Sequence, residues 1–113
     1  MVHEITLSES QDIFHSTLDW IFLLSKYNQS NLLFITKEMF IIDEMWHNFI
    51  LFTEDYNNFC LNYFKRFIHH NPSIKKIILS PKQLGKMYGI IYDEFGETVL
   101  NKWFIEYGKY LKN

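Results

Sequence analysis

TKEMFIIDEMWHNFILFTEDYNNFC, residues 36–60, places its large apolar side chains at the spacing of an α-helix. Thr36 and Thr53 can each cap a helix, and acidic residues follow both of them in the first turn. The pattern therefore predicts one helix over about residues 37–52 and another over about residues 54–68. We expect these two helices to pack antiparallel because the link between them is very short.

Three further helices are predicted around this pair. They span about residues 9–27 with Ser8 as the cap, about 81–95 with Ser80 as the cap, and about 97–111. The apolar stretch 32–35 is too short and isolated to seed a sheet, so we interpret it as a buried connector. The predicted fold is all-α: a compact single-domain bundle of about five helices that occupies residues 1–113.

Composition limits the classes of function. Of the 113 residues, 48% are hydrophobic and 19% are aromatic. That much apolar material can build a packed core, so the composition argues against a disordered chain. The aromatic excess is typical either of a core of large side chains or of a pocket or partner surface. The formal net charge of −2 argues against a nucleic-acid partner.

The compartment is predicted from the cysteine count and the apolar runs. Cys60 is the one cysteine, so no internal disulfide can form and a reducing compartment is the simplest assignment. The first residues lack the basic and apolar regions of a signal peptide, and the longest apolar runs are too short for a membrane span. We therefore expect a cytoplasmic protein without a membrane partner.

The polar face of the 37–52 helix carries the first candidate site. Asp43 and His47 are four residues apart, so their side chains lie on one face of the helix. Such a pair can hold a metal ion, or the carboxylate can orient the imidazole. It can equally be an ordinary pair on a solvated face. Phe40 and Leu51 fall within the same polar arc, which favours an arc that is partly covered.

Two adjacent histidines, His69 and His70, follow the 54–68 helix. If the two helices pack antiparallel, one of these histidines can reach Asp43 and complete a set of two imidazoles and a carboxylate with His47. Such a set with open positions suits zinc or iron. In the other interpretation, the two histidines only complement the dipole at the end of a helix.

Cys60 lies within an aromatic stripe of the 54–68 helix that also contains Tyr56. A lone cysteine in such a stripe is usually a small core residue. The alternative is a thiolate that acts as a ligand or nucleophile beside His47, and rapid alkylation of the folded protein would reveal it.

The run from Asp43 to Cys60, continued to His69 and His70, resembles the glycine-rich-domain-containing protein-like family. The residues that match its Asp-x-x-Trp-His, Tyr, Cys and His pattern are Asp43, Trp46, His47, Tyr56, Cys60 and His70. The likeness covers about a quarter of the chain, and Lys65 stands where that family usually has glycine. The resemblance implies a helical module without a defined reaction, in a short, bacterial-type member that lacks the glycine-rich tail.

Two hypotheses of function follow. In the first, the chain is a small helical binding or interaction module for a protein or small molecule, and the motif residues organise its core. In the second, it is a metal-binding protein or metalloenzyme that acts on a small molecule or peptide. Zinc or iron would then sit on His47 and His70, with Asp43 either as a third ligand or as the group that orients a histidine ligand, and Tyr56 as a hydrogen-bond donor to the substrate. No complete catalytic signature is present, so whether the chain is an enzyme stays open.

Overall fold

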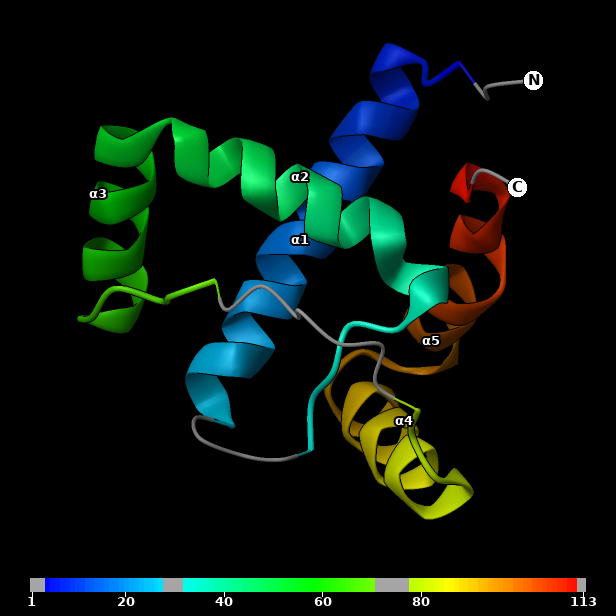
Figure 1. The fold of residues 1–113 in the computed structure, drawn as a ribbon. Coiled ribbons are helices and arrows are strands. Elements are labelled where there is room, and N and C mark those ends of the chain that lie inside the picture. The colour runs from blue at the N-terminus through cyan, green and yellow to red at the C-terminus, as the bar shows by residue number, and fades with distance from the viewer. Residues whose placement is uncertain (1–3, 28–31, 71–77, 112–113) are drawn as a thin grey trace.

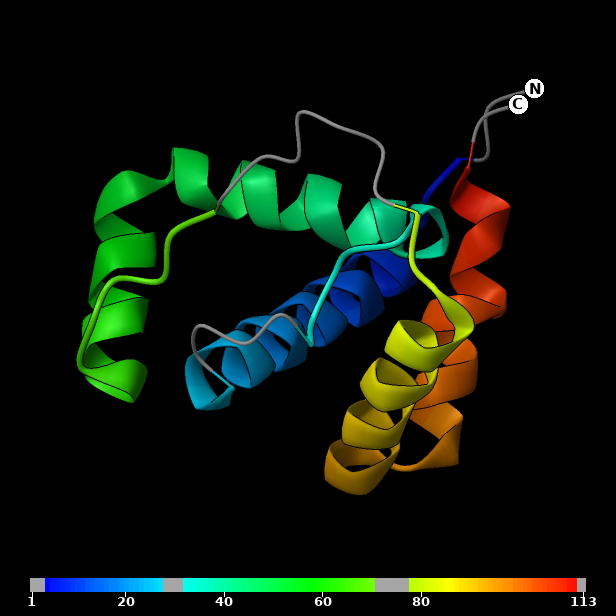
Figure 2. The ribbon, with the colours of Figure 1, turned by 60° about the horizontal axis from the view of Figure 1, so that its bottom comes forward.

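The computed structural model describes residues 4–27, 32–70 and 78–111, and every regular element within these ranges is helical. The elements are α1 (Leu7–Lys26), η1 (Lys37–Met39), α2 (Phe40–Leu51), α3 (Thr53–Phe64), α4 (Pro81–Phe95), α5 (Glu97–Phe104) and η2 (Glu106–Tyr110), where η marks a 3₁₀-helix. The prediction of an all-α single domain with about five helices is confirmed. Helix α2 crosses over α1, while α3 lies beyond one end of α2 and the α4–α5 pair lies towards its other end (Figures 1 and 2).

Helix α1 is capped by Thr6, so the predicted cap at Ser8 is wrong. The Thr6 hydroxyl accepts a hydrogen bond from the backbone N–H of Glu9 at 3.1 Å, and the Glu9 carboxylate accepts one from the backbone N–H of Thr6 at 3.2 Å. This reciprocal arrangement needs a glutamate three residues after the cap, which Thr6 has. The helix therefore begins at Leu7.

The helices predicted over 37–52 and 54–68 exist, but their ends and their packing differ from the prediction. The first opens with the 3₁₀ turn η1, and the predicted cap, the Thr36 side chain, makes no capping hydrogen bond. Helix α3 starts at Thr53 itself and ends at Phe64, since Lys65 adopts a left-handed backbone conformation with φ 64°. Helix α3 turns a corner at the end of α2 instead of packing antiparallel to it (Figures 1 and 2).

Residues 65–70, which we call the return segment, bring the chain from the end of α3 back to α2 without helical structure. Their position follows from two contacts that are described below, one to the side chain of Tyr56 and one to that of Asp43. The α2–α3 corner and the return segment together form the region that contains every residue of the motif.

Helix α4 has the predicted boundaries. Ser80 and Gln83 form a second reciprocal cap with bonds of 2.9 and 3.1 Å, and the helix ends before Gly96, whose φ of 87° suits glycine. The predicted helix over 97–111 is interrupted at Ile105, after which the chain continues as η2. The connector 32–35 contains no helix or strand, and Leu33 within it is buried.

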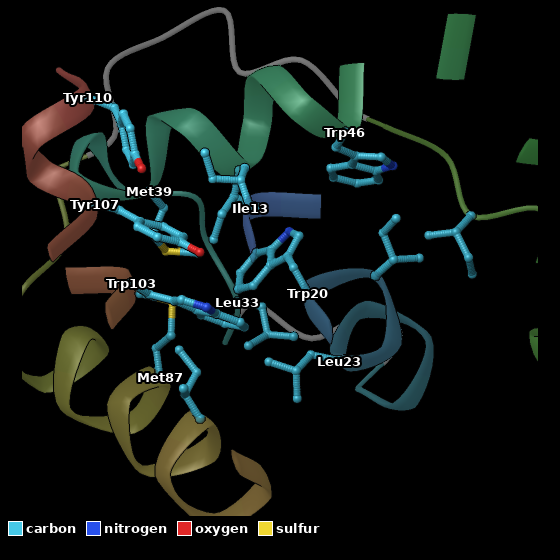
Figure 3. Close-up of a cluster of buried hydrophobic side chains, with 14 of the residues drawn as sticks. Ile13, Trp20, Leu23, Leu33, Met39, Trp46, Met87, Trp103, Tyr107 and Tyr110 are labelled. Atoms are coloured by element: carbon cyan, nitrogen blue, oxygen red, sulfur yellow. The ribbon is translucent and has the colours of Figure 1, made fainter. Parts of the chain in front are cut away.

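The main core lies between α1 and the C-terminal elements (Figure 3). Trp20 and Trp103 meet edge to face at its centre, with ring centroids 6.0 Å apart, and each is at most 1% exposed. Tyr107 and Tyr110 lie at one side of this cluster and Trp46 at the other (Figure 3). None of the helices within the described ranges combines the length and the apolar content that a bilayer crossing requires.

Candidate functional site

The centre of the α2–α3 corner is a chain of hydrogen bonds through the hydroxyl of Tyr56. The indole N–H of Trp46 donates to this hydroxyl at 3.0 Å, and the hydroxyl donates to the backbone carbonyl of Ile68 at 2.5 Å. We call these three groups the corner lock. Since Trp46 lies on α2, Tyr56 on α3 and Ile68 on the return segment, the lock fixes all three pieces of chain relative to one another.

The corner lock is closed to solvent. Tyr56 is completely buried, and Trp46 and Ile68 are each only 4% exposed. Burial raises the pKa of the Tyr56 phenol, the N–H of Trp46 opposes this increase, and the neighbouring Cys60 thiol adds to it. Cys60 itself is completely buried. The phenol and the thiol are therefore part of the packed interior, where an incoming substrate does not meet them.

Asp43 and His70 form the polar part of the motif. The Nε2 atom of His70 lies 2.6 Å from Oδ1 of Asp43, with 12% of the histidine side chain and 37% of the aspartate side chain exposed. The His70 ring also meets the indole of Trp46 at a centroid distance of 4.3 Å. Asp43 and Trp46 are three residues apart on α2, so both can contact one side chain that the return segment supplies.

The other two histidines are placed differently. His47 is exposed, and its ring centroid lies 6.0 Å from that of His70, almost at right angles to it. His69 is also exposed and packs against Phe67 with centroids 4.7 Å apart. Within the described ranges, no three His, Cys, Asp or Glu side chains are arranged to hold a metal ion. The structure thus brings together Asp43 and His70 and leaves His47 beside them.

Two contributors to this region have no signal in the sequence. The first is the carbonyl of Ile68, since a backbone acceptor is the same at every residue. The second is Arg66, whose guanidinium donates to the backbone carbonyl of Ser25 at the end of α1 over 3.1 Å. From the sequence alone, an arginine just after a helix is interpreted as a solvated charge, because the turn at Lys65 cannot be predicted there.

The sequence model of the UCP032817-like family matches residues 2–85. The chain belongs to this family. The matched part includes α1, α2, α3, the return segment and the first turn of α4, whereas α5 and η2 lie beyond it. No curated protein and no solved structure matches the chain.

This membership corrects the resemblance to the glycine-rich-domain-containing protein-like family. The likeness rested on a short set of spacings, whereas the UCP032817-like match also covers α1. The structure gives those spacings a local cause: Trp46 and Tyr56 build the corner lock, and Asp43 binds His70. The description of the UCP032817-like family names no reaction, ligand or partner.

Proposed function

We propose that this member of the UCP032817-like family is a small helical interaction module, whose motif builds the α2–α3 corner and whose partner is another protein. The observation that supports it most directly is the corner lock. The Tyr56 hydroxyl accepts its hydrogen bond from the indole of Trp46 and donates its own to the backbone of Ile68, so Trp46 and Tyr56 have a structural role. The buried Cys60 fits the same role, because a lone buried cysteine usually serves as a small core residue. From this single free thiol we also infer a reducing, cytoplasmic setting.

The region that the lock supports exposes several large apolar side chains. Eight of the twelve residues of α3 are exposed, and they include Leu61 and Tyr63, at 45% and 73% exposure. At the corner itself, Leu51 is 68% exposed and Phe52 is 66% exposed. Clusters of exposed large apolar side chains on small proteins commonly mark interaction surfaces. A rigid internal support beneath such a surface favours binding because little order is lost when a partner docks.

Site-specific photocrosslinking in an extract of the source organism tests the proposal. One variant carries p-benzoylphenylalanine in place of Asn62 on α3, and a matched variant carries it in place of Asn101 on α5; both asparagines are exposed. We expect a discrete protein adduct from position 62 and none from position 101. Equal labelling at both positions, or no discrete adduct at position 62, contradicts an interaction module centred on this corner.

Metal binding is the second candidate, because Asp43 and His70 are both of a residue type that ligates metals and lie next to each other. The 2.6 Å contact between Asp43 Oδ1 and His70 Nε2 is a hydrogen bond, so a bound metal ion would have to displace the proton between these two atoms, and the exposed His47 ring stands 6.0 Å from that of His70. Rotation of the exposed His47 side chain towards this pair would supply a third donor of the kind that zinc and iron accept. In this candidate function, the remaining coordination positions would bind a small molecule or peptide.

Elemental analysis of the untagged protein separates the two candidates. Near-stoichiometric zinc or iron in the parent, absent from a folded His47→Ala variant, supports the metal site. A metal-free parent whose melting temperature does not respond to added zinc or iron contradicts it. A Glu44→Gln variant serves as the control, because Glu44 is an exposed carboxylate of the same helix next to Asp43.

A further inference from the structure

Residues 53–70 form one unit at the edge of the molecule. They comprise α3 and the return segment, and we call them the corner flap. In both ribbon views, α3 lies beyond one end of α2 and away from α4 and α5 (Figures 1 and 2). Among the helices that the structure describes, α2 is the one on which α3 mainly packs. The flap is therefore attached to the rest of the fold mainly along one side.

The flap buries few of its own side chains. Within α3, the buried side chains are those of Tyr56 and Cys60, although the helix has twelve residues, and within the return segment the buried side chain is that of Ile68. Helix α1, by comparison, buries six side chains, and Trp20 among them reaches the centre of the main core. Elements with few buried side chains and much exposed backbone open at a lower free energy than the core does.

The start of α3 is weakly secured. Phe52 precedes the helix, and it is a residue whose side chain provides no capping hydrogen bond to the first turn. Helices α1 and α4, by contrast, each start with a reciprocal cap. Phe52 is also 66% exposed and has a non-helical backbone, with φ −87° and ψ 69°. A change of backbone angles at this corner therefore moves α3 without displacing a side chain of the main core.

A small number of polar contacts hold the flap closed. The corner lock joins it to Trp46, the His70 ring binds Asp43 at 2.6 Å, and Arg66 donates to the backbone of Ser25. The contacts of His70 and Arg66 are only partly buried, and contacts open to water contribute little to stability. The buried corner lock is thus the main polar attachment of the flap.

We propose that the corner flap opens as one cooperative unit while α1, α2, α4, α5 and η2 stay folded. The closed form described above is the main state. The open form exposes the surfaces that the flap and α2 bury against each other, with Trp46 on α2 and Tyr56 and Cys60 on the flap. This motion makes three sealed residues of the motif accessible to a ligand. The inference concerns the motion of the fold and does not depend on the interaction-module function.

Cys60 is a built-in reporter of this opening. It is the one cysteine of the chain and is completely buried, so a thiol reagent reacts with it only when it becomes exposed. The full-length protein is treated with methyl methanethiosulfonate, and the modified fraction is followed over time by mass spectrometry. Each rate is divided by the rate for the same cysteine in the urea-unfolded chain, which removes differences in intrinsic reactivity.

Cysteines introduced into the main core provide the reference. Cys60→Ala is combined with Ile91→Cys in one variant and with Met87→Cys in another, since both replaced side chains are completely buried on α4. We expect Cys60 to react at least about tenfold faster than either reference cysteine, because exposure of the core requires global unfolding. A reference variant that is less stable than the parent reacts faster, so it narrows the expected difference and does not create it.

Two further substitutions separate opening of the flap from global unfolding. Tyr107→Phe removes the hydroxyl that donates to Asp12 between η2 and α1, a contact that stays intact when the flap opens. We expect it to accelerate labelling of the reference cysteines about tenfold and of Cys60 less than about twofold. Tyr56→Phe weakens the corner lock, so it should accelerate labelling of Cys60 by at least about tenfold.

Three results would overturn the inference. The first is a Cys60 that reacts no faster than the reference cysteines, which would show that it is exposed only by global unfolding. The second is an equal acceleration of Cys60 and the reference cysteines by Tyr107→Phe, which has the same meaning. The third is a rate at Cys60 that Tyr56→Phe leaves unchanged, which would show that the reagent enters through small fluctuations without opening of the flap.

Discussion

Two buried tyrosine hydroxyls hold the two sides of the molecule, and they differ in the chemistry of their partners. At the α2–α3 corner, the Tyr56 hydroxyl lies between an indole N–H and a backbone carbonyl, both neutral. At the other side, the Tyr107 hydroxyl donates to the carboxylate of Asp12 at 2.7 Å and lies 2.9 Å from the hydroxyl of Ser16. We call this second group, which ties η2 to α1, the terminal lock.

The terminal lock contains a charge, so its strength depends on pH. Burial opposes the ionised form of Asp12, but hydrogen bonds from Lys102 and Tyr107 outweigh this and lower the pKa of Asp12 below its ordinary value. A carboxylate with a lowered pKa in the folded state adds stability at neutral pH, and this contribution is lost as pH falls through the folded-state value. The corner lock has no group that titrates in this range, so it should persist into acid.

The largest effect is expected from removing the corner hydroxyl. Tyr56→Phe leaves the N–H of Trp46 and the carbonyl of Ile68 buried without their partner, so the free energy of unfolding should fall by about 2–3 kcal/mol. Urea denaturation at pH 7 and pH 4 measures this loss, which should be the same at both values.

Tyr63→Phe is the matched control for this substitution, because Tyr63 is 73% exposed and lies on the same helix. Its hydroxyl can exchange its hydrogen bonds with water, so the change in unfolding free energy should stay within about 0.5 kcal/mol. A loss in Tyr56→Phe no greater than that of the control would show that the corner lock does not hold the return segment.

The terminal lock should give a smaller and pH-dependent effect. Asp12→Asn removes the carboxylate that Tyr107 and Lys102 share, and because 43% of the Asp12 side chain is exposed we expect a loss of only about 1 kcal/mol at pH 7. The parent loses the same contribution on acidification, so the two unfolding free energies should converge as the pH falls through the lowered pKa of Asp12.

A series of urea titrations from pH 7 to pH 2.5 measures this convergence. Asp93→Asn, which changes an exposed carboxylate of α4, provides the control for a general change in net charge. A difference between parent and Asp12→Asn that stays constant with pH would show that the carboxylate does not supply the stability of the terminal lock.

The same comparison explains what sequence reasoning could reach. The helices were predictable because caps and helical spacing are local; Ser80, for example, sits one residue before a proline and caps α4 as predicted. The angle between α2 and α3 was not predictable, because it is set by a single non-helical residue, Phe52, with φ −87° and ψ 69°. An antiparallel pair was therefore the wrong expectation.

At the candidate site, the sequence predicted which residue types would be present, but not which of them would contact one another. Asp43 and His70 were grouped with His47 because all three donors suit a metal, and nothing local separates an exposed imidazole from a bonded one. The structure pairs Asp43 with His70 and leaves His47 apart, because His70 lies on the return segment. The path of this segment depends on a backbone carbonyl and on the conformation of Lys65. The terminal lock has no short-range pattern, since 95 residues separate Asp12 from Tyr107.

The contact between Asp43 and His70 is expected to contribute less than either lock. Asp43→Asn keeps the size of the side chain and removes its charge, and with 37% of that side chain exposed we expect a loss of about 0.5 kcal/mol. Glu44→Gln changes the neighbouring exposed carboxylate and should have no measurable effect. In ¹⁵N–¹H spectra, the indole signal of Trp46 should shift in Asp43→Asn while those of Trp20 and Trp103 stay in place. A shift of all three indole signals would instead show that the substitution disturbs the whole core.

A change of similar small size is expected as a gain in stability, and it comes from the turn that starts the return segment. Both sides of the molecule contain a turn with positive φ: Gly96 at 87° before α5, and Lys65 at 64° after α3. Glycine adopts this conformation freely, whereas a residue with a Cβ atom pays about 1 kcal/mol or more for it. Lys65→Gly should therefore raise the unfolding free energy by about 0.5 kcal/mol after the extra freedom of glycine in the unfolded chain is subtracted. Lys65→Ala is the control, because it shortens the same exposed side chain but keeps the Cβ atom, and it should give no gain. If both variants behaved alike, the left-handed turn would not be a source of strain, and the corner would owe its stability to the Tyr56 hydrogen bonds without a cost at Lys65.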